Sequence, residues 1–220
     1  MLVSVDLDAK TLRSVVSAVP DEYDGTPLLS DVFFDAAPLQ CHTDRMAVAG
    51  ALLFSKYISG VLTFNFECHP ETAASLQDFF SPVSVSVLSI DLKPRPIVAG
   101  DVKVMLDRAD HAFGPTQVLR HNDHMSFRLA SNGVGSFFSP RQVVIATNAP
   151  VLTTEDERSV FAWTPLVAGA VLFADDLFIS HIILPFHYDR LSRDEQSSFA
   201  RLKSVLQTVK ISLEYSSPES

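Results

Sequence analysis

The sequence predicts a mostly β protein, an antiparallel β-sandwich of the jelly-roll type with two or three short helices. Many short segments alternate apolar and polar residues with a period of two, as half-buried strands do. Gly, Pro, Asn and Asp residues separate these segments as turns. We find neither an internal repeat nor the strand-helix-strand rhythm of a nucleotide-binding sheet. The 220 residues suit one large domain, which we place at residues 1–215, followed by a polar tail at 216–220.

The stretch at the centre of this prediction covers residues 83–107 and consists of two strands joined by a proline-bearing connection. In the first strand the alternation slips by one residue after Val87, which a β-bulge would accommodate. Pro94 and Pro96 cannot donate backbone hydrogen bonds, so the chain is expected to leave the sheet there. After Gly100 the alternation resumes, with charged residues on one face. The second strand is therefore expected to be half buried.

Three further elements are predicted in the first half of the chain. Asp8 is the expected N-cap of a helix that ends at Pro20. Residues 46–57 fit either a helix or a strand, and Gly50 with the apolar run after it favours a buried strand. Pro70 stands at the first position of a short helix that ends before the next proline.

The remaining strands come from alternation or from short apolar runs, and most of them are bounded by turn residues. They are residues 3–7, 28–34, 62–66, 125–130, 137–147, 170–174, 177–184 and 211–215. Ser192 and Glu195 form an S-x-x-E capping box, and the residues that follow place their apolar side chains on one helical face. This pattern predicts an amphipathic helix before the last strand.

Charge and cysteine content narrow the functional classes. The net charge of −9 argues against a protein whose whole surface binds nucleic acid, although a local basic patch is compatible with it. Cys41 and Cys68 are too few for a disulfide scaffold or a cysteine zinc site, so we expect two buried, reduced thiols in an intracellular protein. Neither a signal peptide nor a transmembrane helix is expected.

The histidines and paired acids do not form a recognisable catalytic or metal motif. His121 and His124 are three residues apart but lack further ligands at a known spacing, so we interpret them as solvated loop residues. His181 and His187 are interpreted as core or rim histidines, and the pair Asp175–Asp176 as turn residues. Because no nucleophile, base and orienting group occur together, we expect a protein without enzymatic activity, cofactor or metal.

Basic side chains near the predicted strand pair are the candidate binding residues. They are Lys93, Arg95, Lys103 and Arg108. If the two strands form a hairpin, Lys93 and Lys103 would lie near each other on its exposed face. Phosphates need positive charge and hydrogen-bond donors without a particular sequence, so this patch could contact a nucleic-acid backbone. The alternative is an ordinary solvated face, because several aspartates share the neighbourhood.

Two segments resemble plant-virus proteins. The segment VLSIDLKPRP followed by GDVKVMLDRAD, with Gly100 and Asp107, resembles the strand pair of viral jelly-roll coat proteins and of the thirty-kilodalton superfamily of movement proteins. The segment LPFHYDRL at 184–191, with Pro185 and Arg190, is similar to elements of cucumovirus-type movement proteins, with extra residues between the two motifs.

The resemblance implies a movement protein that binds single-stranded RNA without sequence preference and carries it from cell to cell. It further implies a homo-oligomer at plasmodesmata inside the host cell, with host membrane or cell-wall proteins as further partners and no small-molecule substrate. A viral coat protein is the first alternative. The second is a non-viral β-sandwich that acts as a protein-interaction module.

Overall fold

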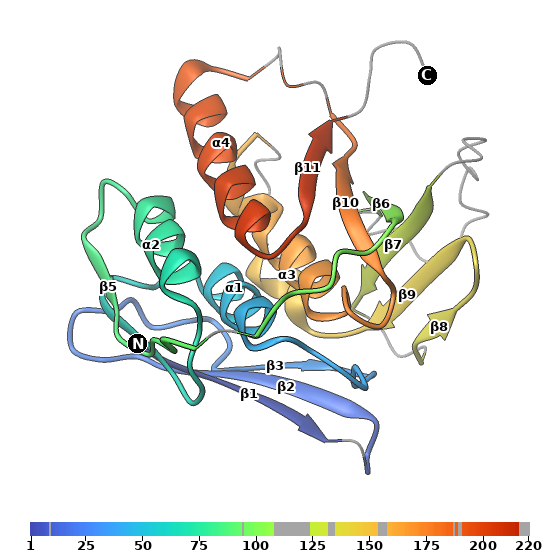
Figure 1. Ribbon diagram of the computed structural model, residues 1–220, viewed down its shortest axis with the longest axis horizontal. Helices are drawn as coiled ribbons and strands as arrows, with labels where there is room; N and C mark the ends of the chain where they lie inside the picture. Colours follow the sequence, from blue (N-terminus) through green and yellow to red (C-terminus); the bar gives the residue numbers. More distant parts are fainter. Residues whose placement is uncertain are drawn as a thin grey trace.

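The computed structural model describes residues 1–8, 10–93, 95–107, 124–131, 135–153, 158–186, 188 and 191–215. In this part of the chain two mixed β-sheets enclose a layer of helices (Figure 1). The α-helices are α1 (Thr43–Leu53), α2 (Pro70–Phe79), α3 (Thr164–Leu172) and α4 (Arg193–Thr208). Two short 3-10 helices, η1 (Ala149–Leu152) and η2 (Val160–Ala162), precede α3. None of the helices in these ranges is long and apolar enough to cross a membrane.

The first sheet has the strand order β3-β2-β1-β4-β5. Its strands are β1 (Leu2–Asp8), β2 (Arg13–Val19), β3 (Asp31–Phe34), β4 (Gly60–Phe64) and β5 (Val85–Val87). The first three strands form an antiparallel meander, while β4 pairs in parallel with β1 and β5 pairs in parallel with β4. Helices α1 and α2 make the two crossovers that parallel pairing requires.

The second sheet has the strand order β11-β10-β6-β7-β9-β8. Its strands are β6 (Val102–Asp107), β7 (Met125–Ala130), β8 (Phe137–Phe138), β9 (Gln142–Ala146), β10 (Ile179–Leu184) and β11 (Ser212–Tyr215). All its described pairings are parallel except the one between β8 and β9.

The two sheets share a plan. In each, three main strands come first and a helix follows them; the next two strands then extend the sheet from the other edge of the first strand. The first sheet runs β1-β2-β3-α1-β4-α2-β5, and the second runs β6-β7-β9-α3-β10-α4-β11 once the two-residue β8 is set aside. The equivalent helices pack on each other across the molecule. The Ser55 hydroxyl lies 3.2 Å from that of Thr164, where α1 meets α3, and the Thr72 and Thr208 hydroxyls lie 3.4 Å apart, where α2 meets α4. One continuous core results.

Glycines allow the central helices to approach the sheets closely. A Cβ atom on Gly50 of α1 would lie 2.7 Å from Cγ1 of Val3 in β1. One on Gly169 of α3 would lie 3.1 Å from the Leu129 side chain in β7. Larger residues would force each helix away from its sheet.

The predicted antiparallel sandwich is therefore wrong, and two of the misassigned elements explain why. Residues 46–57 and 170–174, predicted as strands, belong mainly to α1 and α3, whose side chains are buried almost all round. A helix that is buried on every side shows no 3.6-residue period, so its sequence cannot be distinguished from a buried strand by pattern.

The predicted helix after Asp8 is also wrong, because this segment forms β2. Asp8 does bond to backbone N–H groups, accepting from Lys10 at 2.8 Å and from Thr11 at 3.4 Å. These bonds build the turn between β1 and β2 in place of a helix start. The side chain that favours an N-cap favours a turn equally well.

The predicted strand pair at 83–107 does not form a hairpin. Its first part supplies β5 of the first sheet and its second part supplies β6 of the second sheet, so residues 88–101 connect the two sheets. Gly100 is required by a close approach, because a Cβ there would lie 1.9 Å from the carbonyl oxygen of Phe178. Asp107 ends β6 and Pro185 follows β10, while Arg190 and the tail at 216–220 lie outside the described residues.

Several expected elements are confirmed. These are the strands at β1, β4, β6, β7, β10 and β11, the helix α2 with Pro70 at its start, and the helix α4. The capping box of α4 is complete: Ser192 accepts from the Glu195 N–H at 3.3 Å, and Glu195 accepts from the Ser192 N–H at 2.6 Å.

Candidate functional site

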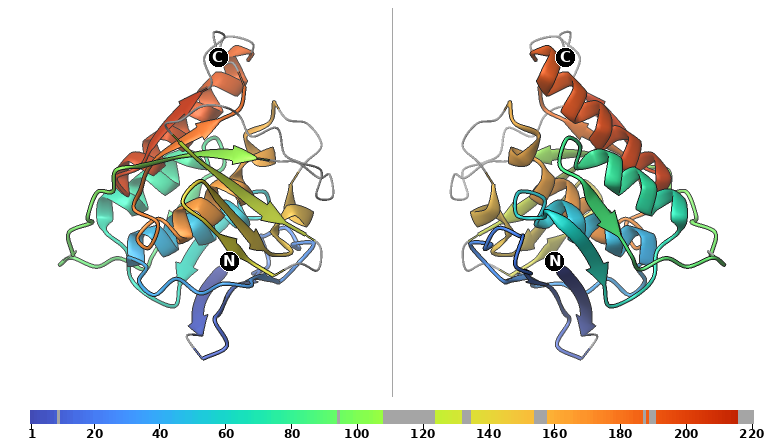
Figure 2. Two further views of the ribbon diagram at one scale, coloured as in Figure 1. Left: turned by 90° about the vertical axis from the view of Figure 1, so that its right-hand side faces the viewer. Right: turned by 90° about the vertical axis from the view of Figure 1, so that its left-hand side faces the viewer.

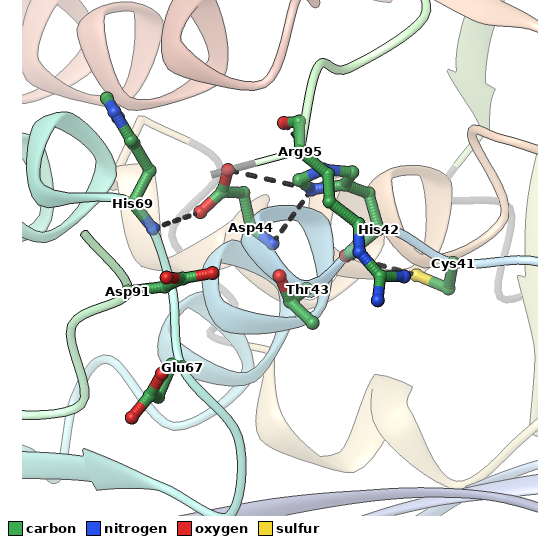
Figure 3. Close-up of a pocket in the computed structure, with 8 residues that line it drawn as sticks. All are labelled: Cys41, His42, Thr43, Asp44, Glu67, His69, Asp91 and Arg95. Carbon is green, nitrogen blue, oxygen red and sulfur yellow. Dashed lines mark hydrogen bonds and ion pairs between the residues drawn. The ribbon is translucent and has the colours of Figure 1, made fainter. Parts of the chain in front are cut away.

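A polar pocket of about 300 Å³ lies where α1 and α2 begin (Figure 3). Each of these helices starts at a histidine that caps it. Nδ1 of His42 accepts from the Asp44 N–H at 3.2 Å, and Nδ1 of His69 accepts from the Glu71 N–H at 3.3 Å. The pocket is lined by Cys41, His42, Thr43, Asp44, Glu67, His69, Asp91 and Arg95.

The His42 ring is held at both nitrogens. Because Nδ1 accepts a hydrogen bond, the neutral ring carries its proton on Nε2. Nε2 lies 3.1 Å from the carbonyl oxygen of Arg95 and donates to it in this tautomer. The ring thus fastens the connection between the sheets to the start of α1, and in this arrangement neither nitrogen is free to act as a base.

Asp44 places a buried carboxylate between the two helix starts. Its Oδ1 accepts from the His69 N–H at 2.6 Å, and its Oδ2 lies 3.5 Å from Nδ1 of His42. The positive end of the α1 dipole favours a negative charge in this first turn. The carboxylate therefore joins α1 to the start of α2.

The two thiols remain protonated at neutral pH. Burial raises the pKa of Cys41, which lines the pocket, and the nearby Asp175 charge raises it further. Burial and then the Asp44 charge raise the pKa of Cys68 to about 12. Because the thiolate is the reactive form, the pocket offers no cysteine nucleophile among its lining residues.

The balance of charge in the pocket is acidic. Asp44, Glu67 and Asp91 face a single guanidinium, that of Arg95. Within the described ranges, no group of three or more His, Cys, Asp and Glu residues is placed to hold a metal ion. The pocket can supply hydrogen bonds and negative charge to a polar group.

Behind the pocket, Arg45 forms a buried ion pair that sequence analysis missed. Its Nη1 lies 2.6 Å from Oδ1 of Asp175, and its Nη2 donates to the carbonyls of Val98 and Val209. Oδ2 of Asp175 accepts from the His42 N–H at 2.7 Å. The signal was present, since an arginine and an aspartate each border a long apolar run, but the two are 130 residues apart.

No described helix or strand covers the outer face of the first sheet (Figure 1 and Figure 2). The helices pack on its other face, where residues such as Val3 and Val16 are fully buried. Leu2 is 44% exposed, lies opposite Val19 in β2 and lies beside Thr63 in β4. Four apolar side chains, here called the apolar row, are exposed on this side: Leu2, Val19, Val61 and Leu88. The register puts Val19 beside Leu2 and Val61 beside Ser86, and Leu88 follows Ser86 by two residues, which keeps it on the same side.

Acidic side chains share this face. In the register of the meander, Asp6 pairs with Val15 and Asp31 pairs with Ser17, so both carboxylates lie on the side of the apolar row. Both are exposed. The Ser17 and Ser30 hydroxyls, bonded to the carboxylate, lower the pKa of Asp31, which keeps it ionised.

The predicted basic patch is divided between the two halves. Lys93 and Arg95 lie exposed on the connection between the sheets, and Arg95 also reaches the polar pocket. Lys103 lies on β6, with its Nζ 3.7 Å from Oε2 of Glu214. Arg108 lies outside the described residues. The hairpin that would have brought Lys93 beside Lys103 is absent, and the role of these residues in binding stays a prediction.

The structure describes only some of the histidines that were considered from the sequence. Nε2 of His181 lies 3.6 Å from Oε1 of Glu214 on the second sheet. His124 directly precedes β7, while His121 and His187 lie outside the described residues. The pocket histidines, His42 and His69, were not singled out, because a histidine that caps a helix has no distinctive spacing.

Comparison with protein-family models, with curated proteins and with solved structures gave no match. The likeness to movement proteins thus stands on short sequence segments alone. The strand pair that carried the first of these segments is not formed.

Proposed function

We propose that this protein is a non-enzymatic binding protein that recognises a protein partner through the outer face of the first sheet. The observation that carries the proposal is the apolar row, whose members are 38% to 62% exposed. Water contact with apolar side chains is unfavourable by roughly 25 cal/mol per Å². Several exposed apolar side chains on one sheet face, interspersed with polar groups such as Thr63, are typical of an interaction site.

The charge of this face selects the kind of partner. Asp6 and Asp31 stand exposed beside the apolar row, and the chain carries a net charge of −9. A second copy docked face to face would bring these carboxylates together, which is unfavourable. A basic amphipathic helix would place apolar side chains on the row and lysines or arginines near the two aspartates. We therefore assign the surface to a partner of that chemistry.

A fluorescent helical peptide with leucines on one face and lysines on the other tests the proposal. The double variant Val19→Asp with Leu88→Asp should bind the peptide about tenfold more weakly, because a charge then replaces each apolar contact. The matched control is Leu39→Asp, which alters a residue that is 85% exposed in a loop. The control should bind like the unaltered protein. Equal affinities for all three proteins would refute the proposal.

The movement-protein hypothesis is a second proposal, with single-stranded RNA as ligand and Lys93, Arg95, Lys103 and Arg108 as phosphate contacts. It is supported by two cationic side chains, Lys93 and Arg95, that lie exposed on one connection. It would place a homo-oligomer at the cell junctions of a host.

Labelled single-stranded RNA at two salt concentrations, with sizing by light scattering, tests this second proposal. The variant Lys93→Ala with Arg95→Ala should bind more weakly and with a shallower salt dependence. RNA binding that is unchanged in the variant removes these residues from the site.

A further inference from the structure

A second pocket, of about 450 Å³, lies where the C-terminal ends of α1 and α2 meet η2 and α4. It is separate from the polar pocket, which lies at the opposite ends of the same two helices. Its size falls within the range of roughly 300 to 1,000 Å³ found for small-molecule sites. The apolar part of its wall comes from Ile58, Phe79, Phe80, Val83, Val160 and Phe161.

Two cationic side chains line this apolar pocket. Lys56 follows the end of α1, and its Nζ donates to the carbonyl oxygen of Leu152 at 2.9 Å. Arg201 comes from α4; its Nη2 donates to the Ser198 hydroxyl at 3.3 Å, and its Nη1 donates to the Ser81 carbonyl. Both cations thus bond to neutral oxygens.

The charges of Lys56 and Arg201 are not neutralised within the described part of the chain. No carboxylate in these ranges forms an ion pair with either side chain. Nε of Arg201 is buried and has no hydrogen-bond partner. Lys56 is exposed overall, and the partial burial of its ammonium group at the pocket rim lowers its pKa. An unpaired cation against an apolar wall is stabilised by an anion that brings its own apolar body.

We propose that this pocket binds an amphipathic carboxylate, a monocarboxylic acid with an apolar chain or ring. The carboxylate accepts hydrogen bonds from Lys56 and Arg201, and the apolar body packs on Phe79 and Phe161. A purely apolar molecule would leave both cations without an anion. A small inorganic anion would leave the apolar wall of the pocket in contact with water. The inference does not depend on the proposed partner of the first sheet, because the two surfaces share no residue.

Calorimetric titration with three probes tests the ligand class. Decanoate, kept below its micelle concentration, should bind at a single site, while decanol and acetate should each bind at least about tenfold more weakly. Decanol binding as tightly as decanoate would overturn the proposed role of the two cations. Absence of saturable decanoate binding would overturn the site itself.

Substitutions locate the ligand. Arg201→Gln and Lys56→Gln should each weaken decanoate binding by about tenfold, because each removes one charged hydrogen bond. Lys203→Gln, on an exposed residue of the same helix, is the matched control. Arg201→Lys keeps the charge and should retain part of the affinity, which separates loss of charge from loss of folding. Decanoate affinity that is unchanged in both Gln variants would contradict the proposal.

Discussion

Arg45 holds a positive charge within the core, where the residue is 1% exposed. Its guanidinium bonds to Asp175 and to the carbonyls of Val98 and Val209, which belong to segments far apart in the sequence. Removing one partner of a buried ion pair leaves the other uncompensated, at a cost of about 3–5 kcal/mol. The residue therefore links four segments of the chain.

Substitutions of the two partners of this ion pair should destabilise the protein by different amounts. Asp175→Asn should lower the free energy of unfolding by about 3–5 kcal/mol, because it leaves the enclosed guanidinium unpaired. Arg45→Met should cost less, because the Asp175 side chain is 18% exposed and keeps its bond from the His42 N–H. Urea unfolding monitored by circular dichroism measures both. An equal or reversed order would contradict this account of the burial.

The Cys68 thiol should make stability decline in alkali. Its pKa is about 12 in the folded protein and 9.0 ordinarily, so the native state keeps a proton that the unfolded state releases. The raised pKa contributes stability that is complete below about pH 9 and is lost as the pH rises toward 12. Urea midpoints measured from pH 8 to pH 11 should fall more steeply for the unaltered protein than for Cys68→Ala. Parallel slopes would show that the thiol is not protected.

At the scale of an element, α4 depends on its first turn. Ser192→Ala removes the cap and should destabilise the protein by about 1 kcal/mol. Hydrogen bonds from the Ser192 backbone N–H and, second, from its hydroxyl lower the pKa of Glu195; the variant loses only the second, so this pKa should rise part of the way toward its ordinary value. Urea unfolding and an NMR titration of the Glu195 carboxyl measure the two effects. Ser197→Ala, at an exposed position of the same helix, should change neither quantity.

Helices and strands could be predicted from the sequence where one face of the element meets solvent and the other is buried. In β6 and β7, alternating buried and half-exposed residues reproduce the period of two, and in α4 the buried residues Phe199, Leu202 and Leu206 share one helical face. Helices α1 and α3 lack a wet face, so their sequences carried no period. Pairing partners were not predictable either, because the alternation of a strand is the same beside a parallel or an antiparallel neighbour.

The candidate surfaces were harder to predict than the elements. In β1, Leu2 and Val3 are both apolar, yet one is 44% exposed and the other fully buried. Only the position of the helices decides which of them meets water. Arg95, a candidate from the sequence, does line a pocket. Lys56 and Arg201 are 145 residues apart in the sequence, and only the fold shows that they line the same pocket.

At the scale of the whole molecule, the two sheets should unfold together. The helices of one half pack on those of the other, and the buried side chains form one core. Trp163 reports on the second half by its fluorescence, while far-ultraviolet circular dichroism reports on both halves. The two urea unfolding curves should coincide, as they do for a cooperative unit. A second transition seen by circular dichroism alone would show that the first half melts independently.

The connection at residues 88–101 is the only covalent path from the first sheet to the second. Everything else that holds the halves together is a contact between surfaces, chiefly α1 with α3, α2 with α4, and the ion pair of Arg45 with Asp175. A polypeptide of residues 1–94 and a separate one of residues 95–220 should therefore reassemble as a one-to-one heterodimer. Fragment complementation of this kind would turn the fold into a reporter, in which two proteins fused to the fragments signal their encounter by restoring Trp163 to its buried state.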